Sequence, residues 1–437
     1  MKDRHFMAPG QKSTGAVFII CPYIVKGIHR VIGPEARLEE AKGLAEAIQL
    51  DVKGYDYFKQ HIIRPATFIS KGHVEAVQGP LKAFDIKLVF IDTTLSPVQQ
   101  RNLEKIWNCK VIDRTGLILE IFGARARTAE GRLQVELAAL TYQRSRLVRS
   151  WTHLERQRGG LGFIGGPGET QLELDRRLID ERIARIKREL EDVKRTRSLH
   201  RKARKRIPYP VVALVGYTNA GKSTLFNRLT HANVMAEHML FATLDPTMRR
   251  VQLPSGREII LSDTVGFISD LPTLLVAAFR ATLEEVVEAD LILHVRDISH
   301  PETEAQSQDV LKVLKDLNLE RAYEMRGIEI LNKCDLLEIQ QIQALQAQVL
   351  RANHPPQCVI SALEGHGVQN LLEKIDHFLA SKEKTYSYIL PHSEGKKVAW
   401  LYAHGEVLEQ KNNEHNTHIT VKLSLENKER FDLFEKE

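Results

Sequence analysis

The sequence predicts an α/β protein of several domains, and two patterns carry that prediction. Two stretches, at about 15–124 and 208–384, alternate short apolar runs with helical patterns, as the strands and helices of a largely parallel sheet do. Between them, apolar residues recur at heptad-like spacing over two long charged segments. We therefore predict a small N-terminal α/β domain at 1–124, an antiparallel helical hairpin at 125–207, a second α/β domain at 208–384 and a small C-terminal domain at 385–437. In the C-terminal domain we expect strands at KKVAWLYAH (396–404) and HITVKLSL (418–425).

Composition places the chain among ordinary globular proteins, with 43% hydrophobic and 27% charged residues. No apolar run approaches the roughly 18–20 residues that span a bilayer, and the N-terminus lacks the apolar core of a secretory signal. Cys21, Cys109, Cys334 and Cys358 are scattered, which indicates reduced thiols and neither a disulfide framework nor a zinc site. We expect a cytoplasmic monomer with no stable membrane insertion and at most peripheral membrane contact.

The N-terminal domain shows no catalytic constellation, only the alternation of strands and helices. Its expected strands are AVFIICPYIV (16–25), ATFIS (66–70), KLVFIDTT (87–94) and CKVIDR (109–114), and its expected helices are EARLEEAKGLAEAIQLDV (35–52) and PVQQRNLEKIW (97–107).

The hairpin is predicted from two apolar seams that flank a glycine-rich loop. The loop contains a G-x-G-x-x-G at Gly160, Gly162 and Gly165, but it follows charged residues rather than a strand, so it is no dinucleotide-binding fingerprint. From residue 176 to 206 there are fourteen Lys/Arg against five acids, which favours a polyanionic partner over a merely solvated face. The seams are Leu133, Leu137, Leu140, Leu147, Trp151 and Leu154 on the first helix, and Ile179, Ile183, Ile186, Leu190 and Val193 on the second.

The chemistry begins with VVALVGYTNAGKSTLFNRL, an apolar strand, a G-x-x-x-x-G-K-S loop and an amphipathic helix. This is a P-loop in its proper context, and it predicts a Ras-like G domain. Backbone N–H groups of such a loop surround phosphate oxygens, and the helix N-terminus adds a favourable potential. We expect Lys222 to reach the β- and γ-phosphates, Ser223 to bind Mg²⁺ and Thr224 to lie near the α-phosphate. The predicted phosphate-binding residues are Gly216, Tyr217, Thr218, Asn219, Ala220, Gly221, Lys222, Ser223 and Thr224.

Guanine specificity is predicted by GIEILNKCD, which ends a strand in Asn332-Lys333-Cys334-Asp335. A carboxylate at Asp335 can accept hydrogen bonds from guanine N1–H and from the exocyclic amine, a pair that adenine lacks. We expect the Lys333 stem to lie along the base and Asn332 to tie this loop to the P-loop. A further strand, CVISALEG, supplies the loop Ser361-Ala362-Leu363, whose backbone is expected to bind the base oxygen.

The switch residues are predicted on two segments between these motifs. REIILSDTVGF ends a strand in Asp263-Thr264-Val265-Gly266, where Asp263 is expected to hold Mg²⁺ through water and the Gly266 N–H to contact the γ-phosphate. Upstream, FATLDPT supplies Phe241, Ala242, Thr243, Leu244 and Asp245; Thr243 is the expected second metal ligand beside Ser223, with Thr247 as a rival.

Catalysis is assigned to Lys222 and Gly266, and one position departs from the Ras pattern. Phe267 follows Gly266, where a Ras-like GTPase has a polar residue that orients the attacking water. The geometry must then be completed by another residue, an ion or a partner. We expect a slow GTP hydrolase that is accelerated in a complex.

These motifs resemble the translation-factor-related GTPases with a hydrophobic residue in place of the catalytic glutamine, and within them the HflX family. The segments VFIDTTLSPVQQRNLEKIWNCKVIDRTGLILEIFGARARTAEGRLQVELAAL, LERQRGGLGFIGGPGETQLELDRR, GYTNAGKSTLFNRLT and FATLDPT are similar to that family in the same order, from about residue 30 to about residue 380. Many members carry an arginine just before the GPGE turn, where this chain has Gly165-Gly166, and the tip is one residue longer.

The resemblance implies the four-part architecture above, binding of GTP and GDP with Mg²⁺, and association with the large ribosomal subunit. It also implies a role in splitting stalled ribosomes under stress, with the hairpin tip directed at ribosomal RNA near the peptidyl-transferase region. The glycines suit such a tip, because a backbone without bulky side chains can approach RNA closely. Phe163 and Ile164 suit it because their side chains can stack or wedge against bases. The alternative is a switch GTPase for ribosome assembly or RNA modification. A nucleoside kinase is disfavoured by the separate NKCD loop.

Overall fold

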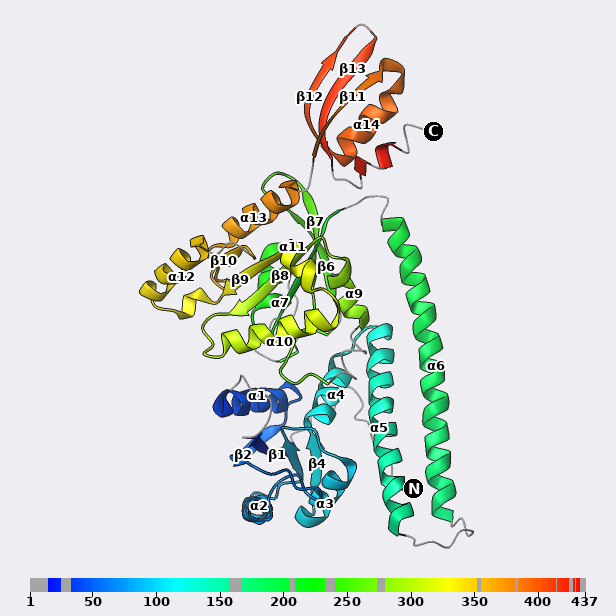
Figure 1. The fold of residues 1–437 in the computed structure, drawn as a ribbon, viewed down its shortest axis with the longest axis vertical. Helices are drawn as coiled ribbons and strands as arrows, with labels where there is room; N and C mark the ends of the chain where they lie inside the picture. Colours follow the sequence, from blue (N-terminus) through cyan, green and yellow to red (C-terminus); the bar gives the residue numbers. More distant parts are fainter. Residues whose placement is uncertain are drawn as a thin grey trace.

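The computed structural model describes most of the chain as three sheets, of which the first two are connected by a long helical hairpin (Figure 1). The α/β class and the P-loop G domain expected from the sequence are confirmed. The described residues are 15–24, 33–157, 167–204, 209–232, 240–241, 243–244, 246–272, 280–351, 355–381, 384–413, 415–423, 427–428 and 430–432.

The first sheet is entirely parallel, with strand order β2-β1-β3-β4. Ser96 and Gln99 form a capping box that starts α3, and the Asp113 side chain caps α4. The elements are β1 (Ala16–Ile24), α1 (Pro34–Ala47), β2 (Asp51–Gln60), α2 (Lys71–Ala83), β3 (Leu88–Ile91), α3 (Pro97–Trp107), β4 (Lys110–Asp113) and α4 (Arg114–Arg125).

The predicted strand at ATFIS is wrong. Arg64 and Phe68 exchange backbone hydrogen bonds across a tight turn, and Phe68 has φ 66° there, so the segment closes on itself instead of joining the sheet. The strand beside β1 is β2, which follows α1 directly and alternates exposed and less exposed residues as an edge strand does.

The hairpin consists of α5 (Ala129–Gln157) and α6 (Pro167–Arg204), and α5 lies between α6 and the first domain (Figure 1). On α6 the predicted seam residues Ile183, Ile186 and Leu190 are buried, whereas on α5 Ala138 and Gln134 are the more deeply buried because α5 also packs on α4. Residues 158–166, most of the glycine-rich tip, lie outside the described residues, as do the side chains of Trp151 and Leu154. No helix in the described part of the chain is long and apolar enough to cross a bilayer.

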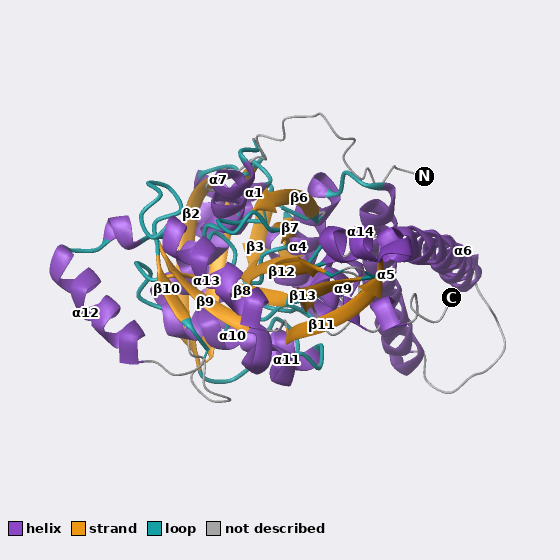
Figure 2. Ribbon diagram, turned by 90° about the horizontal axis from the view of Figure 1, so that it is seen from above, coloured by secondary structure: helices purple, strands orange, loops and turns teal. Residues whose placement is uncertain are grey.

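The second sheet forms the G domain and has the order β10-β9-β8-β5-β7-β6, with only β6 antiparallel to its neighbour. In Figure 2, α5 and α6 lie on one side of the molecule and α12 on the other. The elements of the G domain are β5 (Val211–Gly216), α7 (Lys222–Thr230), β6 (Thr247–Gln252), β7 (Glu258–Asp263), α9 (Arg280–Glu288), β8 (Leu291–Asp297), α10 (Thr303–Asp316), α11 (Glu320–Arg326), β9 (Gly327–Asn332), η1 (Cys334–Leu336), α12 (Ile339–Arg351), β10 (Gln357–Val359) and α13 (Val368–Ser381).

The last sheet is antiparallel, with order β11-β13-β12, and α14 covers one face. The predicted strand at KKVAWLYAH is wrong, because this segment is helix α14 with Leu401 buried against the sheet. HITVKLSL does lie in a strand up to Leu423. The elements are β11 (Lys384–Pro391), η2 (His392–Glu394), α14 (Gly395–His404), β12 (Glu406–Asn412) and β13 (Asn416–Leu423).

Candidate nucleotide-binding site

The P-loop connects the carboxyl end of β5 to the start of α7. Gly216 and Gly221 have φ of 154° and 94°, and a Cβ at either would lie 2.2 Å from Val295 O or Asn332 Nδ2, respectively. Only glycine therefore fits these two positions. Their conformation brings the loop against Val295 of β8 and Asn332 of β9, at the edge of the sheet where the parallel strands have their carboxyl ends, as in other open α/β ligand sites.

Lys222 is folded back over this loop. Its Nζ donates hydrogen bonds to Gly216 O at 3.1 Å and to Tyr217 O at 2.8 Å. Burial lowers the pKa of Lys222 to about 8, and the charge of Asp263 only partly offsets that. A buried ammonium held by two carbonyl oxygens is a group prepared for an anion, because phosphate oxygens would supply the missing negative charge.

Ser223, Thr243 and Asp263 converge beside Lys222. The Ser223 and Thr243 hydroxyls donate to Asp263 Oδ2 at 2.7 and 2.9 Å, and the two hydroxyl oxygens are 2.9 Å apart. Asp263 Oδ1 is buried and accepts no hydrogen bond from a described residue. Burial raises the pKa of Asp263, although Lys222 opposes the shift. Two hydroxyls and an unsatisfied carboxylate oxygen are hard oxygen donors of the kind that Mg²⁺ prefers.

The two threonines that we predicted as alternative metal ligands, Thr243 and Thr247, differ in their contacts. Thr243 contacts both Ser223 and Asp263, whereas Thr247 begins β6, opposite Asp263 in the antiparallel ladder. Of the neighbouring predicted residues, Phe241 and Leu244 are buried in the core, and Ala242 and Asp245 lie outside the described residues.

Gly266 lies against the P-loop. A Cβ there would be 2.8 Å from Thr218 Cγ2 and 3.1 Å from Lys222 Nζ, so a side chain would occupy the phosphate side of the loop. The next residue, Phe267, is 1% exposed, and its backbone exchanges hydrogen bonds with Gly216 O at 3.1 Å and Thr218 N at 2.7 Å. Its ring is part of the hydrophobic core, so it does not supply the polar group of Ras-like GTPases.

The loop from residue 332 to 335 is tied to both neighbouring loops by Asn332. Its Nδ2 donates to Ala220 O at 2.8 Å, and its Oδ1 accepts from Ala362 N at 2.9 Å. Asp335 carries a buried Oδ1 to which no described residue donates. An unpaired carboxylate oxygen at this position is suited to the two donors of guanine.

Arg228 supports the loop from Ser361 to Leu363, and the sequence motifs do not include it. From α7 its Nε donates to Ala362 O at 2.6 Å, and its guanidinium also bonds Leu363 O. Ser361 is fully buried. The helix after the P-loop therefore supports the loop from Ser361 to Leu363 through Arg228.

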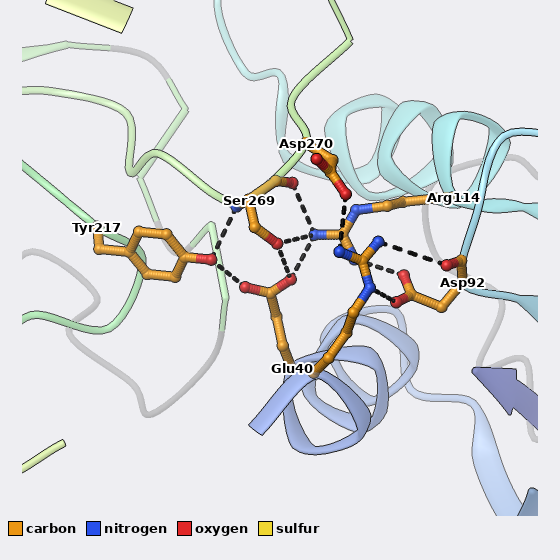
Figure 3. A network of polar contacts seen from close by, with 7 residues as sticks. Glu40, Asp92, Arg114, Tyr217, Ser269 and Asp270 are labelled. Carbon is orange, nitrogen blue, oxygen red and sulfur yellow. Dashed lines mark hydrogen bonds and ion pairs between the residues drawn. The ribbon is translucent and has the colours of Figure 1, made fainter. Parts of the chain in front are cut away.

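A buried polar network joins the P-loop region to the N-terminal domain (Figure 3). Arg114 is 2% exposed; it bonds Asp92 Oδ1 at 2.5 Å, Ser269 O at 2.9 Å and the carboxylate of Glu40. Arg37 bonds the other oxygen of Asp92 at 2.6 Å and Asp270 Oδ2 at 2.7 Å. Ser269 and Asp270, three and four residues after Gly266, are thus held by two arginines of the first domain.

The P-loop itself enters this network through Tyr217. Its hydroxyl accepts a hydrogen bond from Ser269 N at 2.7 Å and donates one to Glu40, which also accepts from Ser269 Oγ at 2.8 Å (Figure 3). Sequence reasoning missed this cluster, because its members come from five separate segments and no motif links them.

Comparisons with known proteins find similarities over most of the chain. Four family descriptions match consecutive parts of the chain: GTP-binding GTPase N-terminal at 35–123, GTP-binding GTPase Middle Region at 125–204, 50S ribosome-binding GTPase at 211–333 and HflX C-terminal domain at 347–436. A GTPase HflX from Magnetococcus marinus is 50% identical over 387 residues, 89% of this chain and 88% of its own. A GTPase HflX from Escherichia coli strain K12 is 46% identical over 340 residues, 77% and 78% of the two chains. A GTP-binding protein from the archaeon Sulfolobus solfataricus, solved with GDP, is 22% identical and covers 84% of this chain and 99% of its own, with a TM-score of 0.45.

Proposed function

Since the chain belongs to the HflX family and is a GTP hydrolase, we propose that it binds the large ribosomal subunit in its GTP state and separates the subunits of stalled ribosomes under stress. The observation that carries the proposal is the junction of a G domain with a 38-residue basic helix, α6. Its exposed basic residues include Arg176, Arg177, Arg185, Lys187, Arg188 and Arg195.

This helix suits ribosomal RNA as a partner. Many exposed arginines and lysines along one rod neutralise successive phosphates and release their counterions, which gives affinity that falls steeply with salt. The glycine-rich tip would then be carried toward RNA near the peptidyl-transferase region, with the protein acting as a cytoplasmic monomer.

In hydrolysis, the oxygen of a water molecule would form a bond to the γ-phosphorus. The bond between the γ-phosphorus and the β–γ bridging oxygen would break, which yields GDP and phosphate. Backbone N–H groups of residues 216–221 and the Lys222 ammonium would stabilise the charge on the phosphates. Ser223, Thr243 and Asp263 would hold Mg²⁺, which when bound supplies positive charge to the phosphates. Because Phe267 is buried, the water must be oriented by another group, so we expect slow turnover that the ribosome stimulates.

The guanine base would lie over residues 332–335, with Asp335 accepting from N1–H and the amine. The unpaired, buried Oδ1 of Asp335 supports this assignment, because such an atom is costly unless a ligand completes it.

Nucleotide state would reach the ribosome-facing parts through Ser269 and Asp270. γ-Phosphate contacts at Gly266 reorder the following residues in GTPases of this kind, and here those residues are held by Arg37 and Arg114. A ligand shifts such an equilibrium only through different affinity for the two states. We therefore expect tighter ribosome binding with a GTP analogue and, reciprocally, tighter GTP binding on the ribosome.

The test is sedimentation of purified 70S ribosomes and separate subunits with the protein and either a non-hydrolysable GTP analogue or GDP. Co-sedimentation with the large subunit that depends on the GTP analogue, and loss of 70S particles with GTP, are expected. Binding only to incomplete precursor particles would instead support an assembly role, and no binding in either nucleotide would overturn the proposal.

A further inference from the structure

The carboxylate of Asp297 contacts the loop from residue 332 to 335 through Lys333. Asp297 ends β8 opposite Asn332, which ends β9, in the parallel ladder. Its Oδ2 forms an ion pair with Lys333 Nζ at 2.6 Å, and the two side chains are only 12% and 21% exposed. A pair so far removed from water is stronger than a surface ion pair and holds both groups in one geometry.

Asp297 is itself held in place. Its Oδ1 accepts hydrogen bonds from Ser299 N at 3.0 Å and from Ser299 Oγ at 2.5 Å, so only Oδ2 is directed at the lysine. The adjacent Ile298 N donates a hydrogen bond to Asn332 O at 3.1 Å, so the pairing of β8 with β9 continues to the end of both strands. The carboxylate therefore acts as a fixed anchor for Lys333.

Lys333 has an unusual backbone conformation for its residue type. Its φ is 65°, in the left-handed region that favours glycine, and it is the single residue between the end of β9 and η1. Such a conformation persists where the surroundings determine it, and it is often found at ligand sites. Here it turns the chain toward Asp335 while the side chain remains tied to Asp297.

We propose that Asp297 is a positioning residue for guanine binding: it holds the Lys333 amine so that the methylene stem lies where the base will stack. This rests on the proposed role of residues 332–335 in binding guanine. An unrestrained lysine stem loses several rotamers on binding, whereas a stem held in place beforehand does not, so the ion pair raises nucleotide affinity. Asp297 would touch no nucleotide atom and would act through Lys333 alone.

The experiment is a double-mutant cycle on GDP binding, measured by titration calorimetry with Mg²⁺. Asp297→Asn keeps the shape and the acceptor for Ser299 but loses the charge, and we expect it to weaken GDP binding about tenfold, as loss of a charged hydrogen bond does. Lys333→Met keeps an apolar stem without the amine and should weaken GDP binding similarly. The double variant should bind no more weakly than either single one, because both remove the same interaction.

A second readout separates positioning from a general structural role. In steady-state GTP hydrolysis, Asp297→Asn should raise KM in proportion to the loss of affinity and change kcat much less. The matched control is Glu304→Gln, which breaks the ion pair of Glu304 with Arg296 beside the same end of β8 at a site where Glu304 is 72% exposed. This control should bind GDP as the wild type does.

The outcomes distinguish the inference from the proposed function. Wild-type GDP affinity in Asp297→Asn, or additive losses in the double variant, would overturn the positioning role. Wild-type GDP affinity in both Lys333→Met and Asp335→Asn would overturn the assignment of the guanine loop itself. A loss of affinity in Lys333→Met but not in Asp297→Asn would leave that assignment standing and sink only the inference.

Discussion

The Tyr217 hydroxyl of the P-loop donates a hydrogen bond to the Glu40 carboxylate of the N-terminal domain. The same hydroxyl accepts from Ser269 N, so the phosphate loop, the segment after Gly266 and helix α1 share one buried polar group (Figure 3). Interdomain contacts are usually smaller and more polar than a core, and domains move unless such contacts hold them. In this protein the contact that holds them is also attached to the nucleotide site.

The first prediction concerns the cation at the centre of this contact. Arg114→Met should reduce the free energy of unfolding by about 3–5 kcal/mol, because Asp92, which is 0% exposed, would lose a charged partner without access to water. Chemical denaturation at neutral pH measures this loss. The exposed pair of Arg177 and Glu181 on α6 supplies the control, since Arg177→Met should change stability by less than about 0.5 kcal/mol. Equal stability of the two variants would contradict the structural role of the network.

The same network shows what the sequence does not reveal. Arg37, Glu40 and Arg114 read as ordinary helix surface charges, and only the fold brings them to Ser269. The P-loop and the NKCD segment are different, because their chemistry needs adjacent residues on one turn and is therefore visible as a motif. The support that Arg228 and Asp297 give to neighbouring loops is not visible as a motif, because each contacts residues far away in the chain.

Errors in the predicted elements have a similar cause. In KKVAWLYAH, Val398, Trp400 and Tyr402 alternate as a strand would, while Val398 and Leu401 have helical spacing. Packing decides between them, since Leu401 is buried against the last sheet. β2 has no counterpart among the predicted strands, because its less exposed side, positions 52, 54, 56, 58 and 60, carries only two apolar residues, Val52 and Phe58.

The second prediction uses an acidic group beside the interdomain contact. The pKa of Asp309, on α10, is raised to about 6, chiefly by burial and then by the nearby charges of Asp270 and Glu40, against the lowering effects of Lys312 and Arg114. A carboxyl whose pKa is raised by folding is bound to its proton more tightly in the folded state. Its ionisation therefore costs stability at pH 7, and that cost disappears as the pH falls from about 6 toward the unfolded value of about 4.

Asp309→Asn should accordingly raise the free energy of unfolding by about 1–2 kcal/mol at pH 7, a figure reduced for the partial exposure of the side chain. The gain should vanish near pH 4. Thermal unfolding at both pH values checks this, with Asp316→Asn at the exposed end of the same helix as the control. A gain in stability that is the same at pH 7 and pH 4 would show that Asp309 is not the titrating group.

The third prediction concerns nucleotide choice. Asp335→Asn replaces an acceptor by a donor opposite guanine N1–H, and a buried mismatch of this kind costs about 1–3 kcal/mol. GTP affinity should fall, and xanthosine triphosphate, which carries an oxygen in place of the amine, should be preferred. Competition between the two nucleotides for the variant measures the change. Glu338→Gln, on an exposed residue just beyond the loop, should keep the wild-type preference; an Asp335→Asn protein that also kept it would show that this carboxylate does not contact the base.

The last prediction tests the hairpin tip. Replacing Gly159 to Gly168 by a short turn should leave the G domain and its basal GTP hydrolysis nearly unchanged, because α6 packs on α5 and its buried Ile183 and Ile186 lie well beyond the tip in the sequence. It should remove most ribosome-stimulated hydrolysis and the separation of subunits on gradients with GTP, because the shortened hairpin no longer reaches its RNA contact.

A variant with basic residues of α6 neutralised is the control for the tip deletion. Changing Arg195, Arg197, Arg201 and Lys202 to glutamine should weaken ribosome binding broadly and flatten its salt dependence, since each lost phosphate contact reduces the salt slope by about one. The tip deletion should instead leave that slope nearly unchanged, because residues 159–168 include no charged residue, while it abolishes subunit separation. If the tip deletion separates subunits as fast as the wild type does, the glycine-rich loop is only a turn, and the activity must come from the basic helix and the G domain.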